Sequence, residues 1–222
     1  MKLPWLLVAS GLLAASAARA QSVRASGPTP ASFIPRGYQL LRNLQATGDL
    51  NGDGRPDAVL ALTSVAEADE LHPGSDRPPR LLLVLWRTAT GAYQLGVAAR
   101  RLMLHNHESL NGDDPLDGIS IRRGILLVQY DAGGNWGRST TAKFRYQQGN
   151  LYLIGETDAY GTHHFNCDKL PYPPRYSYRD TNFLTGAYEL IRTSEECDLL
   201  VHRRGRQPLR PLRKLTSYAP AP

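Results

Sequence analysis

The chain has 222 residues and a formal net charge of +6, and after its first twenty residues no segment is apolar enough to cross a bilayer. This excludes a protein anchored by a transmembrane helix within the rest of the chain. Two of its 26 basic residues, Lys2 and Arg19, lie in the first twenty, so the remaining chain is only modestly basic.

Residues 1–20 have the features of an export signal, with a basic start, an apolar run and a small-residue Ala-x-Ala end. The apolar run contains Pro4 and Gly11 and is too short for a comfortable membrane span. Cleavage after Ala20 would leave Gln21 first, without a cysteine for a lipid anchor. We therefore expect an exported, unanchored protein, in the periplasm or secreted.

Residues 21–36 are rich in Ser, Pro and Ala, show no apolar period, and are predicted to form a flexible leader. Residues 37–218 spread their aliphatic segments without a long polar linker, which predicts a single β-rich domain with a basic C-terminal segment.

Within that domain the apolar residues come in short blocks bounded by turn residues, a pattern typical of strands: residues 57–64, 80–88, 92–100, 119–130, 141–149, 150–160, 186–193 and 197–203. The block 80–86 is apolar on both faces and should be central. Turns at Thr90-Gly91 and Gly149-Asn150 predict two hairpins. We expect a mainly β fold: an antiparallel sheet or sandwich, or partial propeller-like units. Minor helix is possible at residues 37–48 and 104–110.

The stretch "DLNGDGRPD" places oxygen ligands at every second position, as calcium loops do, with a glycine sixth for the positive φ. The ligands would be Asp49, Asn51, Asp53, the carbonyl of Arg55, and Asp57. Leu60 stands where an EF-hand needs a bidentate Glu, so the EF-hand is excluded. The alternative is a plain Asn-Gly and Asp-Gly turn, but a turn does not require all three aspartates.

The sequence "GDLNGDGRPDAVLAL" resembles the Asp-x-Asp-x-Asp-Gly-x-x-Asp loop and following strand of FG-GAP and VCBS-type repeats. That resemblance implies a calcium-holding loop between β-strands. It covers about fifteen residues and occurs once, so a closed propeller does not follow from it. Along most of the chain the motifs P-x-G-Y, GDLNGDG, DP-x-x-GISI, GGNWGR, F-x-Y and NFLTG follow one another in this order. This order is similar to that of a group of exported bacterial β proteins of unknown activity that share one such loop, and the resemblance implies architecture and compartment.

Two further groups of residues, cysteines and histidines, could form a disulfide or bind a metal. Cys167 and Cys197 are the only cysteines and predict one disulfide in an oxidising compartment, although "HHFNC" leaves a free or metal-bound Cys167 open. His105 and His107 would share a strand face and could bind zinc with a further ligand such as His163 or His164. Solvated histidines are the simpler interpretation.

The basic residues concentrate at the C-terminal end, between Arg203 and Lys214, with no acid among them. This segment is interpreted either as an edge strand guarded by arginines or as a site for an anionic envelope component. The export signal argues against nucleic acid.

The resulting function hypothesis is a calcium-stabilised, non-catalytic binding or structural protein of the cell envelope, with partner and activity unknown. The alternative is a small metal-dependent or carboxylate-dependent hydrolase that would use His105, His107, Asp113 and the 163–167 region. No hydrolase elbow, zincin, phosphate-loop or dinucleotide motif is present in the sequence.

Overall fold

The computed structural model describes residues 23–65, 79–102, 114–132, 136–162 and 176–220. Their strands form two antiparallel sheets, as predicted for a mainly β protein. The smaller sheet has five strands in the order β1-β5-β4-β3-β2: β1 (Ser26–Gly27), β2 (Tyr38–Gly48), β3 (Asp57–Ser64), β4 (Leu81–Arg87) and β5 (Tyr93–Ala99). The larger sheet holds seven strands in simple sequence order from β12 to β6: β6 (Leu116–Arg122), β7 (Ile125–Ala132), β8 (Trp136–Gln147), β9 (Asn150–Thr162), β10 (Ser177–Asn182), β11 (Ala187–Thr193) and β12 (Leu199–Arg206).

The smaller sheet is buried on both faces because its central strands are apolar at nearly every position. All eight residues of β3 are buried, and so are the first five of β4. One face joins the core shared with the larger sheet through Val59, Leu82 and Val84. The other face packs Leu60 and Leu83, among others, into a second cluster. The prediction that residues 80–86 form a central strand is therefore confirmed.

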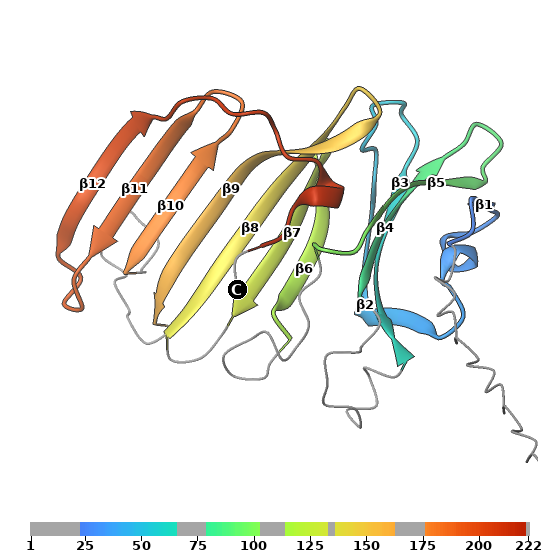
Figure 1. Cartoon of the computed structure of the whole chain (residues 1–222), viewed down its shortest axis with the longest axis horizontal. Helices are drawn as coiled ribbons and strands as arrows, with labels where there is room; N and C mark the ends of the chain where they lie inside the picture. The colour runs from blue at the N-terminus through green and yellow to red at the C-terminus, as the bar shows by residue number, and fades with distance from the viewer. Residues whose placement is uncertain (1–22, 66–78, 103–113, 133–135, 163–175, 221–222) are drawn as a thin grey trace, which may run out of the picture.

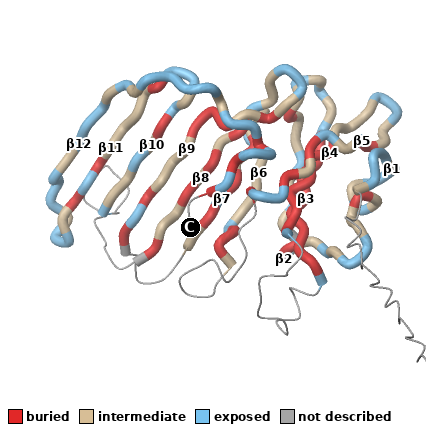
Figure 2. Tube along the Cα trace, viewed as in Figure 1, coloured by how far each residue is buried: buried red, intermediate tan, exposed pale blue. Residues whose placement is uncertain are grey.

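The larger sheet contributes to the shared core only through its first strands. Leu126, Val128, Phe144 and Leu153 belong to that core, and we call the face that carries them the front face. Strands β10 to β12 extend away from the smaller sheet (Figure 1). Exposed residues follow β12 and the segment after it, whereas buried residues concentrate between β3 and β9 (Figure 2).

Both predicted hairpins are present. Gly91 lies in the turn between β4 and β5 with φ +83°, and Gln148 and Gly149 join β8 to β9 with φ +48° and +83°. Positive φ at both central residues suits the twist of a two-residue hairpin, which explains the Gly there.

Residues 37–48 are not helical, because they form strand β2 along β3. The register shifts between Leu40 and Gln45, and Arg42 has φ +43°. Because of this irregularity, the side chain of Leu40 packs in the second cluster, whereas those of Leu41 and Leu44 pack in or against the shared core. A helix would have placed these leucines on one face, so the local spacing was misleading. Residues 104–110 lie outside the described residues.

The prediction of a flexible leader over residues 21–36 is wrong for its described part. β1 pairs with β5, and a short 3-10 helix, η1 (Pro30–Phe33), follows it. Phe33 is 1% exposed in the second cluster, so this segment covers the outer face of the smaller sheet. One apolar side chain among Ser and Pro residues is too sparse a signal to show a period.

The strands differ from the prediction in two further places. The block 119–130 is two strands, β6 and β7, joined by a tight turn in which Arg123 and Gly124 have positive φ. Strand β10 was not predicted at all, although it pairs with both β9 and β11.

After β12 the chain turns back across the sheet. It passes the ends of β11 and β10, pairs with β9 through Tyr152 and Lys214, and ends near η3 (Leu215–Ser217) (Figure 1). Leu215 and Tyr218 are buried in the shared core, and Tyr218 Oη donates to Glu156 Oε2 at 2.7 Å. The C-terminal segment is therefore fixed to the front face by its own apolar residues.

Candidate functional site

The predicted calcium loop connects β2 to β3 and is closed by its own hydrogen bonds. The carboxylate of Asp49 accepts the backbone N–H of Gly52 at 2.7 Å and of Gly54 at 2.8 Å. Gly52 and Gly54 both have φ +79°, so the positive φ expected at the sixth loop position is present. Asn51 Nδ2 donates to Asp53 Oδ2 at 2.9 Å, which brings the first three predicted ligands close together.

Asp57, the ninth loop residue, is fully buried and joins the loop to the sheet. Its Oδ2 accepts the N–H of Leu50 at 2.9 Å, and its Oδ1 accepts the N–H of Arg87 on β4, also at 2.9 Å. Burial raises the pKa of Asp57, and these backbone hydrogen bonds oppose that rise. Both carboxylate oxygens of Asp57 thus accept hydrogen bonds from backbone N–H groups.

The carboxylate of Asp53 contacts a positively charged side chain of the same loop, that of Arg55. Its Oδ1 accepts the backbone N–H of Arg55, and its Oδ2 pairs with the Arg55 guanidinium. Desolvation pushes the pKa of Asp53 upward, but the hydrogen bonds from Arg55 and Asn51 and the charge of Arg55 outweigh it, so the pKa lies below its usual value.

This arrangement does not by itself form a metal centre. Among the described residues, no group of three or more His, Cys, Asp or Glu side chains is placed to hold a metal ion. Asp49, Asn51 and Asp53 offer oxygen atoms, while Asp57 is directed at the backbone and Asp53 at Arg55. Calcium at this loop, with the carbonyl of Arg55 as a further ligand, remains a prediction.

The other predicted site residues are mostly outside the described part. His105, His107, Asp113, His163, His164 and Cys167 all lie there. Cys197 follows the end of β11 with φ +69° and is not a free thiol, but its predicted pairing with Cys167 remains a prediction.

The register of β10 to β12 separates their charges by face, because residues paired across strands share a face. Ala142, in the shared core, pairs with Glu156, which pairs with Thr181 on β10. Thr181 is therefore on the front face. Every second residue of β10, counted from Thr181, is on that face too, and so are the residues that pair with them on β11 and β12. The arginines on this face are Arg179, Arg192 and Arg203.

The acids of these three strands lie on the opposite, back face. Asp180 pairs across the strands with Glu189, and both already have partners. Lys143 Nζ lies 2.7 Å from Asp180 Oδ1, and Glu189 Oε1 lies 2.8 Å from both His202 Nε2 and Arg204 Nη2. Hydrogen bonds from His202 and Arg204 hold the pKa of Glu189 below its usual value. The acids on the back face of β10 to β12 are thus paired with cations, whereas the front face of these three strands carries arginines and no acid. The nearest front-face acid in the register is Asp158 of β9, which lies opposite Arg179 and pairs with Arg138.

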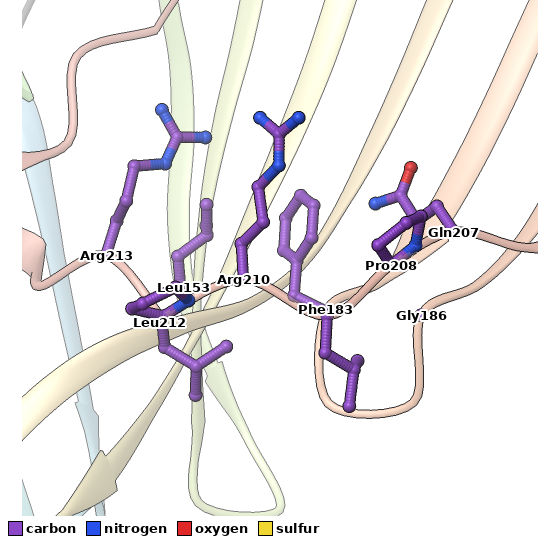
Figure 3. Close-up of a pocket in the computed structure, with 10 residues that line it drawn as sticks. Leu153, Phe183, Gly186, Gln207, Pro208, Arg210, Leu212 and Arg213 are labelled. Atoms are coloured by element: carbon purple, nitrogen blue, oxygen red, sulfur yellow. The ribbon is translucent and has the colours of Figure 1, made fainter.

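The C-terminal segment adds a pocket to this basic front side. A cavity of about 480 Å³ lies where residues 207–213 pass β9 and the turn between β10 and β11. Its apolar lining includes Leu153, Phe183, Leu209 and Leu212. Arg210 and Arg213 line it too, and their guanidinium groups extend to the same side of the segment (Figure 3).

The front-face arginines of β10 to β12 and the two arginines at the pocket form no ion pair with a carboxylate within the described ranges. Arg192, Arg203 and Arg210 are exposed, and none of them forms an ion pair with a described residue. The guanidinium of Arg213 lies 5.1 Å from the centre of the Tyr218 ring. Arg179 Nη2 donates to Gln207 Oε1 at 3.0 Å, and its guanidinium stacks on Tyr188. Gln207 also lines the pocket, so Arg179 connects the strand arginines to the cavity.

The C-terminal arginines were predicted as a basic segment, and the structure divides them. Arg203 is on the front face of β12, Arg204 is on its back face, and Arg210 and Arg213 line the pocket. The edge-strand interpretation holds for residues 199–206, since β12 is the outermost strand of its sheet. Sequence reasoning missed Arg179, Arg192 and the apolar pocket residues. Period-two alternation in 177–182 and 187–193 would have revealed the two arginines once β10 was recognised.

Comparison of the chain with known protein families, with curated proteins and with solved structures found no match. None of the described helices is long and apolar enough to span a membrane.

Proposed function

We propose that this protein is an exported, calcium-stabilised, non-catalytic binding protein that holds an anionic component of the cell envelope on the front side of β10–β12. The single observation that carries this proposal is the separation of charge by face. On β10 to β12 the front face carries arginines and no acid, while the acids of the same strands are paired on the back. Asp158 of β9 lies opposite Arg179 but forms its ion pair with Arg138, and Arg192 and Arg203 lie farther from β9.

Unpaired guanidinium groups on one surface attract anions and present planar donors to carboxylate, phosphate or sulfate oxygens. Arg179, Arg192 and Arg203 lie on neighbouring strands, whose spacing is about 5 Å, so a single extended anion can contact several of them. The sheet fixes their positions, which lowers the ordering cost on binding. The export signal predicted in residues 1–20 makes envelope anions the relevant partners.

Removal of two front arginines is expected to weaken anion binding. Fluorescently labelled dextran sulfate, followed by anisotropy, should bind the wild-type protein with an affinity that falls as salt rises. The double variant Arg192→Gln/Arg203→Gln should bind about tenfold or more weakly, because two charge contacts are lost.

Arg122→Gln/Arg145→Gln is the matched control. These arginines are exposed and lie in one cross-strand row on the back face of β6 and β8, so the change in net charge is identical. We expect less than about a threefold change in this variant. If both double variants bind dextran sulfate equally weakly, the loss of affinity comes from the change in net charge alone, and the proposed binding face is wrong.

Calcium is proposed to stabilise the loop by taking the place of Arg55 on Asp53. The closeness of Asp49, Asn51 and Asp53 supports this, since a cation relieves the repulsion between neighbouring carboxylates. Millimolar calcium should raise the melting temperature by roughly 5–10 °C at saturation. Asp53→Ala should abolish the shift, whereas Asp117→Ala, an exposed acid on β6, should keep it. Absence of any shift in the wild type would end the calcium proposal and leave the anion-binding face unaffected.

A further inference from the structure

We infer that the anion held on the front side is amphiphilic, and that its apolar group occupies the pocket between the C-terminal segment and the ends of β9 to β11. This inference rests on the proposed function, because it assigns the kind of ligand that the arginines hold. The apolar part of the lining includes the side chains of Leu153, Phe183, Leu209 and Leu212. The pocket volume of about 480 Å³ falls within the range of small-molecule sites and suits one alkyl chain or a similar group.

The pocket is fastened at both ends by backbone hydrogen bonds. Gln207 N donates to the carbonyl oxygen of Gly186 at 2.9 Å, and Leu153 N donates to the carbonyl oxygen of Arg213 at 2.8 Å. Pro208 and Pro211 lie between these two points and restrict the backbone further. A site held this way is formed before the ligand arrives, which favours binding of a small group over collapse of the cavity.

Leu209 supports an apolar occupant. It lines the pocket yet is 64% exposed, the largest exposed fraction among the described large hydrophobic residues. Burial of this side chain against an alkyl group removes apolar surface from water on both partners. A purely polar anion would leave Leu209 and the floor of the pocket in contact with water.

The arginines set the position of the charged group. Arg210 and Arg213 line the pocket and extend to one side of it (Figure 3). Arg210 is exposed and has no ion-pair partner among the described residues, and Arg213 is held against the Tyr218 ring. The ligand therefore combines an apolar chain in the pocket with a phosphate, sulfate or carboxylate group at these guanidinium groups. A free amphiphile and a lipid in a bilayer share this chemistry.

Calorimetric titration of the full chain with methyl, butyl, hexyl and octyl phosphate tests this inference. The affinity should rise about threefold for each added methylene until the pocket is filled. Octanol, which has the same chain and no charge, should bind at least about tenfold more weakly than octyl phosphate. Equal affinity for methyl and octyl phosphate would overturn the pocket assignment and leave the anion-binding face standing.

Two pairs of variants locate the site. Leu209→Ser should weaken octyl phosphate about fivefold or more, whereas Leu200→Ser, at a leucine 60% exposed on β12, should not. Arg210→Gln should weaken octyl phosphate, whereas Arg145→Gln on the back face should not. If octanol binds as tightly as octyl phosphate and dextran sulfate does not bind, the proposed function fails together with this inference.

Sedimentation with vesicles separates the two sources of ligand. Vesicles containing anionic phospholipid should bind the wild-type protein less in the presence of octyl phosphate, because both use one site. Vesicle binding that is unaffected by octyl phosphate, in a protein that shows no chain-length dependence, would overturn the inference in favour of surface attraction alone.

Discussion

Asp57→Ala is expected to lower the free energy of unfolding by about 2–5 kcal/mol in calcium-free buffer, measured by urea denaturation. The carboxylate is 0% exposed and satisfies the N–H groups of Leu50 and Arg87, which its loss leaves without an acceptor. A buried donor without a partner costs about 1–3 kcal/mol. Asp57→Asn, which keeps one carbonyl oxygen, should fall between the wild type and alanine.

Asp53→Ala provides the control on the same loop. Its side chain is 24% exposed and bonds chiefly to Asn51 and Arg55, so its loss should cost less than about 1 kcal/mol without calcium. If Asp53→Ala and Asp57→Ala destabilise equally, the role assigned to Asp57 in joining the loop to β4 is wrong.

Arg80→Met is expected to cost about 3 kcal/mol or more, measured in the same way. Arg80 is 2% exposed and forms two 2.9 Å hydrogen bonds with the carboxylate of Asp114, which is 13% exposed. The pair precedes β4 of one sheet and β6 of the other, so it links the two sheets. Loss of the guanidinium leaves the largely buried carboxylate of Asp114 without its positively charged partner, while the backbone N–H of Leu116 still donates to Oδ1 at 3.0 Å.

The double variant Arg80→Met/Asp114→Asn removes that stranded charge and should be more stable than Arg80→Met alone. Arg138→Met applies the same substitution to an ion pair whose side chains are 37% and 31% exposed, and it should cost less than about 1 kcal/mol. Additive losses in the Arg80 double variant would show that the two residues are not coupled.

The sequence predicted best those strands whose burial leaves a simple record. β3 and β4 are apolar on both faces, and the β4–β5 and β8–β9 turns need glycine for a positive φ, so composition alone identifies them. β10, with the sequence "SYRDTN", extends beyond the smaller sheet and leaves no apolar alternation to detect. β2 is irregular, and its leucines alternate only after the register shift at Leu40.

The candidate site was only partly predictable for a related reason. The calcium loop is contiguous, so its ligands and its glycine φ could be read from nine residues, but the burial of Asp57 depends on Arg87 in another strand. The pocket joins residues near 153, 183 and 207–213, which come together only because the C-terminal segment returns across the sheet. No pattern within a short stretch of sequence indicates that the C-terminal segment returns across the sheet.

β12 ends the larger sheet, and a terminal strand exposes backbone groups that another chain could pair with. Arg203 projects from one side of this strand and Arg204 from the other. A second copy approaching edge to edge would therefore meet like charge above and below the plane of the sheet, and only Arg204 is offset by Glu189. Arg203, which we propose as a contact for the anion, would thus also protect the fold from aggregation at its open edge.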